Sequence, residues 1–364
     1  MLCLILKFYS DRTIPMNKLN QSEPNEQLSP RETIIQLSRG FMISQCLFAV
    51  TKLGIADLLK EGPKHCDDLA AVTNTHSDSL YRFLQVLAHL DVFSETQPKC
   101  FQLTPLSAFL QDDGPESLRN FILLLAEQNY ACWENVLYSL RTGKSAFTYT
   151  HGMNCFQYHK QHPALAENFD RAMVELSVMR NSAVLAAYDF SSLEKLADVG
   201  GGDGSLLVDI LQHHPALKGI LFEQPAVIER ALNVLKKAGV QDRCELVSGN
   251  FFESVPVEAD AYMLKQVLQN WDDQSAIKVL RNCRQAMLRG GRLLIIERIA
   301  SPNTCLAGKI QDLNMLVVFS AGRVRTKDEF HKLFEVAGFK LTQIVSTTSE
   351  VSVIEGECDT KKRP

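Results

Sequence analysis

The feature that most constrains the fold is the glycine-rich stretch Asp198-Val-Gly-Gly-Gly-Asp-Gly204, which directly follows a short apolar run. Glycines at such a place let the backbone turn sharply and let a ligand come close without a clash with a Cβ atom. A phosphate-binding P-loop would need Gly-Lys followed by Ser or Thr, and the dinucleotide fingerprint would need glycine where Ser205 stands. The stretch therefore predicts a strand, a turn and a helix, with a ligand site of another kind at the turn.

From Glu194 onward, short apolar runs alternate with amphipathic helical stretches. The apolar runs that predict strands are 196–199, 219–222, 244–247, 259–264 and 292–296. This rhythm is typical of a doubly wound, Rossmann-like parallel sheet of the α/β class. Two later runs, 341–345 and 352–355, predict a hairpin at one edge, which brings the expected sheet to seven strands.

The pattern before Tyr188 is mainly helical. Ser29-Pro30 is a helix start, and residues 40–59 carry apolar side chains on nearly every face, which predicts burial against a second copy of the chain. Residues 66–103 predict two helices followed by two short strands, a winged-helix unit. Such a unit binds DNA in regulators. Here, however, the second helix offers only Arg82 as a cation, and the carboxylates of Asp78 and Asp91 would repel phosphate. We therefore expect a dimerisation scaffold.

Length and composition narrow the remaining classes. A chain of 364 residues exceeds one ordinary core, and we expect five segments: a disordered leader (1–28, with 1–15 an upstream extension), a winged-helix-like dimerisation domain (29–115), a helical linker or lid (116–190), a ligand-binding domain (191–358) and a tail (359–364). The net charge of −4 does not favour binding to nucleic acid or to an anionic membrane. No run approaches the ~18 apolar residues of a membrane span. Ten cysteines without a C-x-x-C pair indicate reduced thiols in the cytoplasm and no metal site.

The spacing of an acidic residue and alternate glycines resembles that of S-adenosylmethionine (SAM)-dependent methyltransferases, which predicts SAM held against Gly200 and Gly202. Glu223, at the end of the second strand, can accept hydrogen bonds from ribose hydroxyls or be a solvated charge. After the third strand, Asn250 can bond the adenine amino group while Phe251 lies against the ring, although Phe251 also suits a core. Lys265 ends the fourth strand and can flank the cofactor or be solvated.

Further motifs make the resemblance specific: Asn270-Trp-Asp-Asp273, Leu288-Arg-Gly-Gly-Arg292 and Arg323-Val-Arg-Thr326. With the glycine turn they resemble the caffeate/isoflavone and acetylserotonin O-methyltransferase family over residues 30–356. The resemblance implies a homodimer, SAM at the sheet edge, and an aromatic hydroxyl substrate between lid helices and cofactor. The family lines its substrate pocket at positions that are here Met173, Trp271, Met315 and Phe319, although such apolar residues also suit a plain core.

One departure bears on mechanism. The family places a histidine, the general base, two residues before the tryptophan, and this chain has Gln269 there. Glu297 matches the first carboxylate that supports the histidine, whereas the second falls on Val324. A glutamine amide cannot take up a proton at neutral pH. In this respect the chain resembles the bacterial branch that tailors anthracycline-like secondary metabolites, whose members lack the base.

The sequence therefore predicts O-methylation by positioning, with Gln269 and Asn270 orienting a phenol that ionises below the ~10 of tyrosine. Alternatives remain open at this stage: Asn270 as a helix cap, Glu297 as the base if burial raises its pKa, or a substitute base among His151, His159 and His162. For the whole chain the alternatives are a SAM-binding enzyme with non-methylating chemistry, such as hydroxylation, and a winged-helix regulator.

Overall fold

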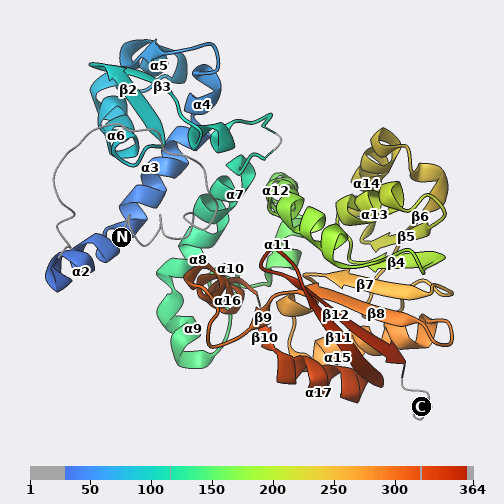
Figure 1. Ribbon diagram of the computed structural model, residues 1–364. Coiled ribbons are helices and arrows are strands. Elements are labelled where there is room, and N and C mark those ends of the chain that lie inside the picture. Colours follow the sequence, from blue (N-terminus) through green and yellow to red (C-terminus); the bar gives the residue numbers. More distant parts are fainter. Residues whose placement is uncertain (1–28, 115, 320–321, 359–364) are drawn as a thin grey trace. The chain divides into compact units, whose positions relative to one another are not determined.

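The computed structural model describes residues 29–114, 116–319 and 322–358 (Figure 1). The leader and the tail expected at 1–28 and 359–364 lie outside the described residues. The chain divides into two compact units, residues 1–122 and 123–364. The finer division at 115/116 and 190/191 stays a prediction.

The first unit is helical with a small sheet. Its elements are α2 (Pro30–Ser38), α3 (Gly40–Lys52), α4 (Ile55–Leu58), β1 (Lys64–His65), α5 (Cys66–Thr73), α6 (Ser77–His89), β2 (Phe93–Gln97) and β3 (Cys100–Leu103). Ser29 caps α2 as predicted, because its hydroxyl accepts from the Glu32 backbone while the Glu32 carboxylate accepts from the Ser29 backbone. The antiparallel sheet has the order β1-β3-β2. Two helices and a hairpin thus follow each other as expected, while the winged-helix assignment stays a prediction.

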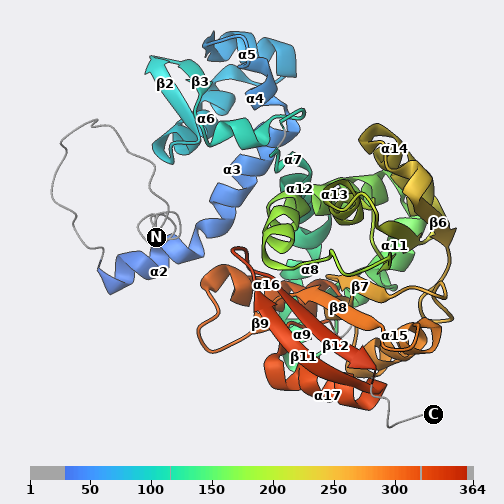
Figure 2. The same ribbon diagram turned by 45° about the vertical axis from the view of Figure 1, so that its right-hand side comes forward.

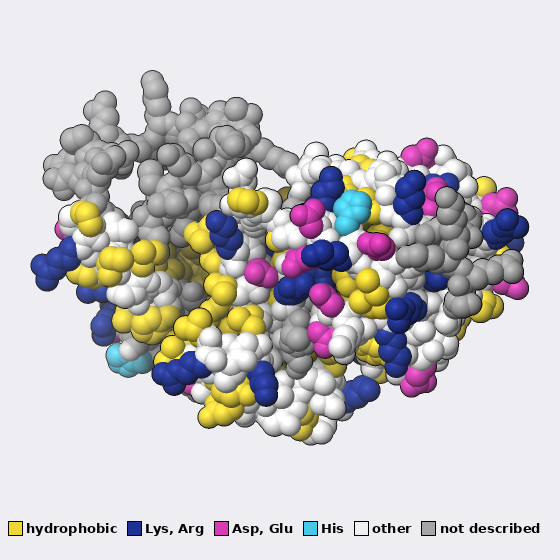
Figure 3. Space-filling model, turned by 90° about the horizontal axis from the view of Figure 1, so that it is seen from below, with side chains coloured by type: hydrophobic (Ala, Val, Ile, Leu, Met, Phe, Trp, Pro, Cys, Tyr) yellow, Lys and Arg dark blue, Asp and Glu magenta, His cyan; other side chains and the backbone are white. Residues whose placement is uncertain are grey.

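Apolar side chains remain exposed along α2 and α3, among them Ile34, Leu37, Phe41 and Met42. Hydrophobic side chains accordingly cover much of the left-hand part of the face in Figure 3, where α2 lies. Among the described residues, one helix, Pro30–Lys52, is long and apolar enough to cross a membrane by length and composition, with a mean hydropathy of 1.3. The sequence predicted a helix start at Ser29-Pro30 and a separate apolar stretch at 40–59; helical backbone at Arg39 joins α2 and α3 into one length.

The second unit contains the sheet that the sequence predicted. Its seven strands have the order β11-β12-β8-β7-β4-β5-β6 (Figures 1 and 2). The bounds are β4 (Lys195–Val199), β5 (Lys218–Glu223), β6 (Cys244–Ser248), β7 (Ala261–Lys265), β8 (Arg292–Glu297), β11 (Phe339–Ser346) and β12 (Ser352–Cys358). β4 to β8 pair in parallel, and the hairpin of β11 and β12 joins β8 antiparallel at the edge. The α/β fold and the edge hairpin are therefore confirmed.

Helices cover both faces of the sheet (Figure 2). One buried cluster joins the strands to α12 (Pro163–Ala187), α13 (Ser205–His213) and α14 (Pro225–Ala238). A second cluster joins them to α15 (Asp273–Ala286) and α17 (Lys327–Ala337). Burial on both faces explains why the strands read as continuous apolar runs.

A third cluster in this unit joins short helices to α16 (Leu306–Val318). The short helices are α8 (Tyr130–Glu134), α9 (Val136–Thr142), α10 (Ala146–His151) and α11 (Cys155–Gln161). Two of the expected pocket residues, Met315 and Phe319, belong to this cluster. The short helices that fall within the predicted lid segment 116–190 therefore pack with α16 around an apolar centre of their own, and their role as a lid stays a prediction.

Candidate functional site

The glycine-rich turn lies where β4 passes into α13, at the carboxyl edge of the sheet. Gly200 and Gly202 have φ of 72° and 62°, a conformation that side chains with a Cβ rarely adopt. A Cβ on Gly201 would lie 2.4 Å from Asp198 Oδ2, whereas one on Gly202 would meet no atom within 4 Å. The turn is thus tightly packed on its protein side and open at Gly202, as a cradle for a ligand requires.

Asp198 lies beneath this turn with 1% of its surface exposed. Its Oδ1 atom has no hydrogen-bond partner among the described residues, and burial raises the pKa of the carboxyl to about 7, opposed by the charge of Lys265. Lys265 is not a free solvated charge, because its Nζ donates to Asn181 Oδ1 of α12 at 2.9 Å, and burial lowers its pKa. An orphaned carboxylate oxygen beside an open glycine turn fits a bound group that carries hydrogen-bond donors, as SAM does.

Glu223 ends β5 and is tied to the same turn. Its Oε2 accepts from the backbone N–H of Gly202 at 3.3 Å, and its Oε1 accepts from that of Gln224 at 2.7 Å. Burial raises the pKa of the Glu223 carboxyl. The structure therefore brings the predicted ribose acceptor and the glycine turn together.

Asn250 and Phe251 follow β6. Phe251 lies beside the turn, since its ring is 3.6 Å from the place that a Cβ on Gly200 would take. Asn250 is exposed and closes a local turn: its Oδ1 accepts from the Phe252 backbone, and its Nδ2 donates to Glu253. Its assignment to the adenine amino group stays a prediction, and that donor would share Asn250 Oδ1 with the Phe252 N–H.

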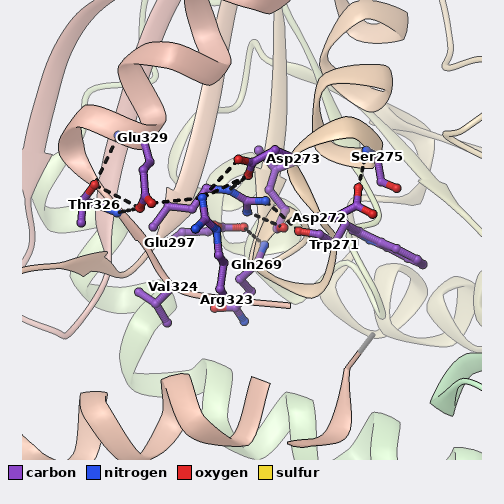
Figure 4. A network of polar contacts seen from close by, with 12 residues as sticks. Gln269, Trp271, Asp272, Asp273, Ser275, Glu297, Arg323, Val324, Thr326 and Glu329 are labelled. Atoms are coloured by element: carbon purple, nitrogen blue, oxygen red, sulfur yellow. Dashed lines mark hydrogen bonds and ion pairs between the residues drawn. The ribbon is translucent and has the colours of Figure 1, made fainter. Parts of the chain in front are cut away.

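The short helix η4 (Leu268–Asn270) carries Gln269, the residue that the sequence places at the expected base position. Gln269 donates its backbone N–H to Glu297 Oε1 at 2.9 Å, and its carbonyl accepts from the backbone N–H of Arg323 at 2.9 Å (Figure 4). Its side-chain amide makes no hydrogen bond within the part of the chain that the structure describes. The backbone of Gln269 is thus fixed while its amide is available.

Glu297 ends β8 and is 1% exposed. Burial raises the pKa of its carboxyl to about 7, opposed by the Gln269 N–H bond and by the charge of Arg325. Its Oε2 has no partner among the described residues. The Glu297 carboxyl thus holds the backbone of η4.

Asn270, Asp272 and Val324, which belong to the motifs around Gln269, each make a different contact. Asn270 donates from Nδ2 to the carbonyl of Gln266 at 3.2 Å, whereas Asp272 caps α15 by accepting from Ser275 N at 2.7 Å. The alternative that Asn270 is the helix cap is therefore wrong. Val324 donates its backbone N–H to Asp312 on α16 and brings no carboxylate, as expected.

The apolar wall is only partly as predicted. Trp271 stacks on Phe156 with centroids 5.4 Å apart, and Phe156 lies 5.9 Å from Phe319. Met315 and Phe319 are buried in the lid cluster, and Met173 lies half-buried on α12 outside it. Phe156 was not among the pocket residues that the sequence predicted, because no motif marks it.

Two of the three histidines considered as substitute bases have hydrogen-bond partners. His159 Nε2 lies 2.8 Å from Gln128 Oε1, and burial lowers its pKa to about 4. His162 Nδ1 lies 2.8 Å from the carbonyl of Tyr158. His151 packs against the Phe147 and Tyr158 rings, and its buried Nε2 has no partner among the described residues, so its assignment as a base stays a prediction. Among the described residues, no three His, Cys, Asp or Glu side chains are placed to hold a metal ion.

Comparison with known proteins agrees with this geometry. Residues 133–340 match the model of the O-methyltransferase domain, and residues 35–113 match that of the O-methyltransferase dimerisation domain. The chain is 41% identical to a phenazine O-methyltransferase of Lysobacter antibioticus, over 88% of this chain and 94% of that protein. It is 32% identical to aclacinomycin 10-hydroxylase of Streptomyces purpurascens, over 89% of each.

Among solved structures, human N-acetylserotonin methyltransferase in complex with SAM superposes with a TM-score of 0.85 at 27% identity, covering 93% of this chain and all of that one. The match to the family models spans both units, and the glycine turn and Glu223 fit the cofactor. The chain therefore belongs to the O-methyltransferase family and is a SAM-dependent O-methyltransferase with the family's dimerisation domain.

Proposed function

We propose that the protein transfers a methyl group to the hydroxyl of a fused aromatic substrate of the hydroxyphenazine kind, and that it does so without a protein base. The relative that is 41% identical, a phenazine O-methyltransferase, supports this substrate class. The observation that carries the mechanism is Gln269, whose backbone is fixed and whose amide is free at the expected base position.

Gln269 and Asn270 orient the hydroxyl. Bound SAM supplies the methyl group as an electrophile. The free amide of Gln269 can hold the acceptor oxygen by a hydrogen bond, and correct orientation of two reactants can lower a barrier by about 7–11 kcal/mol. Since no group on η4 takes up a proton, the acceptor reacts as its anion, which an acidic phenol forms in water. The phenolic proton therefore leaves to solvent before transfer.

Glu297 is a support in this proposal. It is 1% exposed, and one of its oxygens already accepts from the Gln269 backbone. A pKa of about 7 would suit a general base, so the support role rests on this burial and this bond and not on the pKa. In the proposal, Glu297 fixes η4, and its burial keeps it from the acceptor hydroxyl.

The cofactor is assigned to the residues around the glycine turn. Gly200 and Gly202 form the cradle, Glu223 accepts from the ribose hydroxyls, Phe251 faces the adenine, and Lys265 flanks the methionine part. The bond between Glu223 and the Gly202 backbone supports this group. Asn250 is assigned as the acceptor for the adenine amino group. The substrate pocket is proposed to be lined by four apolar side chains: Met173, Trp271, Met315 and Phe319.

A second candidate is non-methylating chemistry on bound SAM. Two observations favour it. One relative is named aclacinomycin 10-hydroxylase. This chain also has Gln269 where the family's histidine is expected and Val324 where the second carboxylate is expected. The mass of the product separates the two: methyl transfer adds one CH₂, whereas hydroxylation adds one oxygen.

A pair of substitutions separates the two halves of the site. We expect Glu223→Ala to weaken SAM binding by about 1–3 kcal/mol, through the loss of charge-assisted hydrogen bonds. We expect Gln269→Ala to leave SAM affinity within a factor of about two while turnover falls, because its amide faces the acceptor. Calorimetry with SAM and an assay with labelled SAM and 1-hydroxyphenazine measure both.

Each variant is the other's control. Equal loss of affinity in both variants would contradict the division of roles. A sharp gain of methyl transfer in Gln269→His would show instead that the missing base limits the reaction.

The support role of Glu297 predicts a pH dependence of stability. Its pKa is raised in the folded chain from 4.5 to about 7, so its contribution to stability is complete below pH 4.5 and is lost as the pH rises through 7. Glu297→Gln keeps an acceptor for Gln269 without this loss. We expect it to gain about 1–3 kcal/mol of unfolding free energy relative to the parent between pH 5 and pH 8.

Urea unfolding at both pH values tests this. Asp198 titrates in the same direction but is present in both proteins, so its effect cancels in the difference. A difference that stays constant from pH 5 to pH 8 would show that Glu297 is ionised throughout.

We propose that the protein is a homodimer through its first unit and that it works in the cytoplasm. The dimerisation-domain match and the exposed apolar face of α2 and α3 support the dimer. The nine cysteines in the described residues, all free, support a reducing compartment, which cell fractionation tests. The segments 29–115, 116–190 and 191–358 are proposed as its functional divisions.

Light scattering is expected to give about twice the 40.8 kDa of one chain. Phe41→Glu should shift the protein towards monomer, because it places a charge in the apolar contact face. Val72→Glu changes an exposed residue of α5 and should stay dimeric. A compact monomer for the parent protein would end this proposal.

A further inference from the structure

A buried arginine lies against the segment that carries Gln269. Arg325, in β10 (Arg325–Thr326), is 0% exposed, which is rare for a guanidinium. β10 pairs in parallel with β9 (Ile299–Ala300), which follows Glu297 in the chain. Arg325, on β10, and Glu297, at the end of β8, therefore reach η4 from strands of two different sheets.

The guanidinium holds both ends of η4. Nη1 donates to the carbonyl of Leu268 at 2.7 Å, and Nη2 donates to that of Trp271 at 2.7 Å. Nε donates to Asp273 Oδ1 at 3.0 Å, which sets the plane of the group. The two carbonyls flank Gln269 and Asn270, so one planar cation spans the pair of polar residues.

The middle of η4 is held separately. The N–H of Gln269 donates to Glu297, and its carbonyl accepts from the backbone N–H of Arg323. Figure 4 shows Gln269 among these residues. Four backbone groups between Leu268 and Trp271 are thus fixed in a segment of one helical turn. A short turn has little stability of its own, and a misplacement of 1 Å in a reacting pair can cost about a hundredfold in rate.

We propose that Arg325 is a positioning residue for methyl transfer, which holds Leu268 and Trp271 so that the Gln269 and Asn270 side chains face the acceptor. The inference rests on the proposed function in one respect, that these two side chains orient the acceptor. Lysine cannot replace this group, because an ammonium lacks the planar fork that reaches two carbonyls at once. The positive charge also lies beside Glu297 and opposes the rise of its pKa.

The chain contains a matched control. Arg243 donates from Nη1 to the carbonyls of His214 and Leu217 at 3.2 and 3.1 Å, and from Nη2 to that of Leu211 at 2.8 Å. It precedes β6, at the amino edge of the sheet, away from η4. Arg243→Lys therefore removes the same kind of backbone clamp without touching the site.

The experiment compares Arg325→Lys and Arg243→Lys in the full chain, in a Trp133→Phe background that leaves Trp271 as the single tryptophan. Four quantities are measured: the melting temperature, the Kd for SAM, kcat and KM with 1-hydroxyphenazine, and acrylamide quenching of Trp271. Asp273→Asn is added as a milder variant, which keeps the guanidinium but loosens its plane.

We expect Arg325→Lys to lower kcat at least tenfold with the Kd for SAM within threefold, and to raise the quenching constant of Trp271 at least twofold. Asp273→Asn should change the same quantities less. Arg243→Lys should leave kcat and quenching within a factor of two, even where its melting temperature falls as far.

The inference is overturned if Arg325→Lys leaves Trp271 quenching unchanged, or if kcat falls no further than in Arg243→Lys at equal loss of melting temperature. Quenching does not depend on turnover. If the parent protein transfers no methyl group, the proposed function fails, and the quenching comparison still decides whether Arg325 orders η4.

Discussion

The hydrogen bond from the Gln269 backbone to Glu297 joins the sheet to the turn that carries the proposed acceptor-orienting residues. Glu297 stands at the end of β8, an interior strand that pairs with β7 and β12, so its place is fixed by the sheet. Burial raises the pKa of its carboxyl to about 7. The same burial leaves the carboxyl 1% exposed, so it meets the η4 backbone and not the surface.

Two buried carboxyls are arranged alike along the carboxyl edge of the sheet. Asp198 and Glu297 each have one oxygen without a partner among the described residues, and each has a cation nearby, Lys265 for the first and Arg325 for the second. Asp198 lies under the open glycine turn, whereas Glu297 lies under η4. The edge thus offers one polar support to the cofactor and another to the segment that meets the acceptor.

The sequence predicted what depends on local pattern. The seven strands follow from apolar runs, the turn at Gly200 and Gly202 follows from glycine chemistry, and Gln269 stands out against the family's motif. Contacts between distant segments could not be predicted in this way. Arg325 binds a carbonyl 57 residues away, and its motif gives no sign that its side chain turns inward.

Smaller errors have the same origin. Asp272 and not Asn270 caps α15, because both residues are good caps and only the backbone of η4 decides between them. The sequence could not show that His159 lies against Gln128, a contact between residues 31 positions apart. Phe156 reaches Trp271 through the packing of α11, which a periodicity in the sequence does not specify.

The central claim is that the acceptor reacts as its own anion, without a base from the protein. The most direct test is the pH dependence of kcat/KM for two hydroxyphenazines, one of them carrying an electron-withdrawing group that lowers its pKa. The account predicts that the midpoint of the profile moves with the pKa of the acceptor hydroxyl. A midpoint that is the same for both acceptors would contradict it, because a titrating group of the protein would then accept the proton.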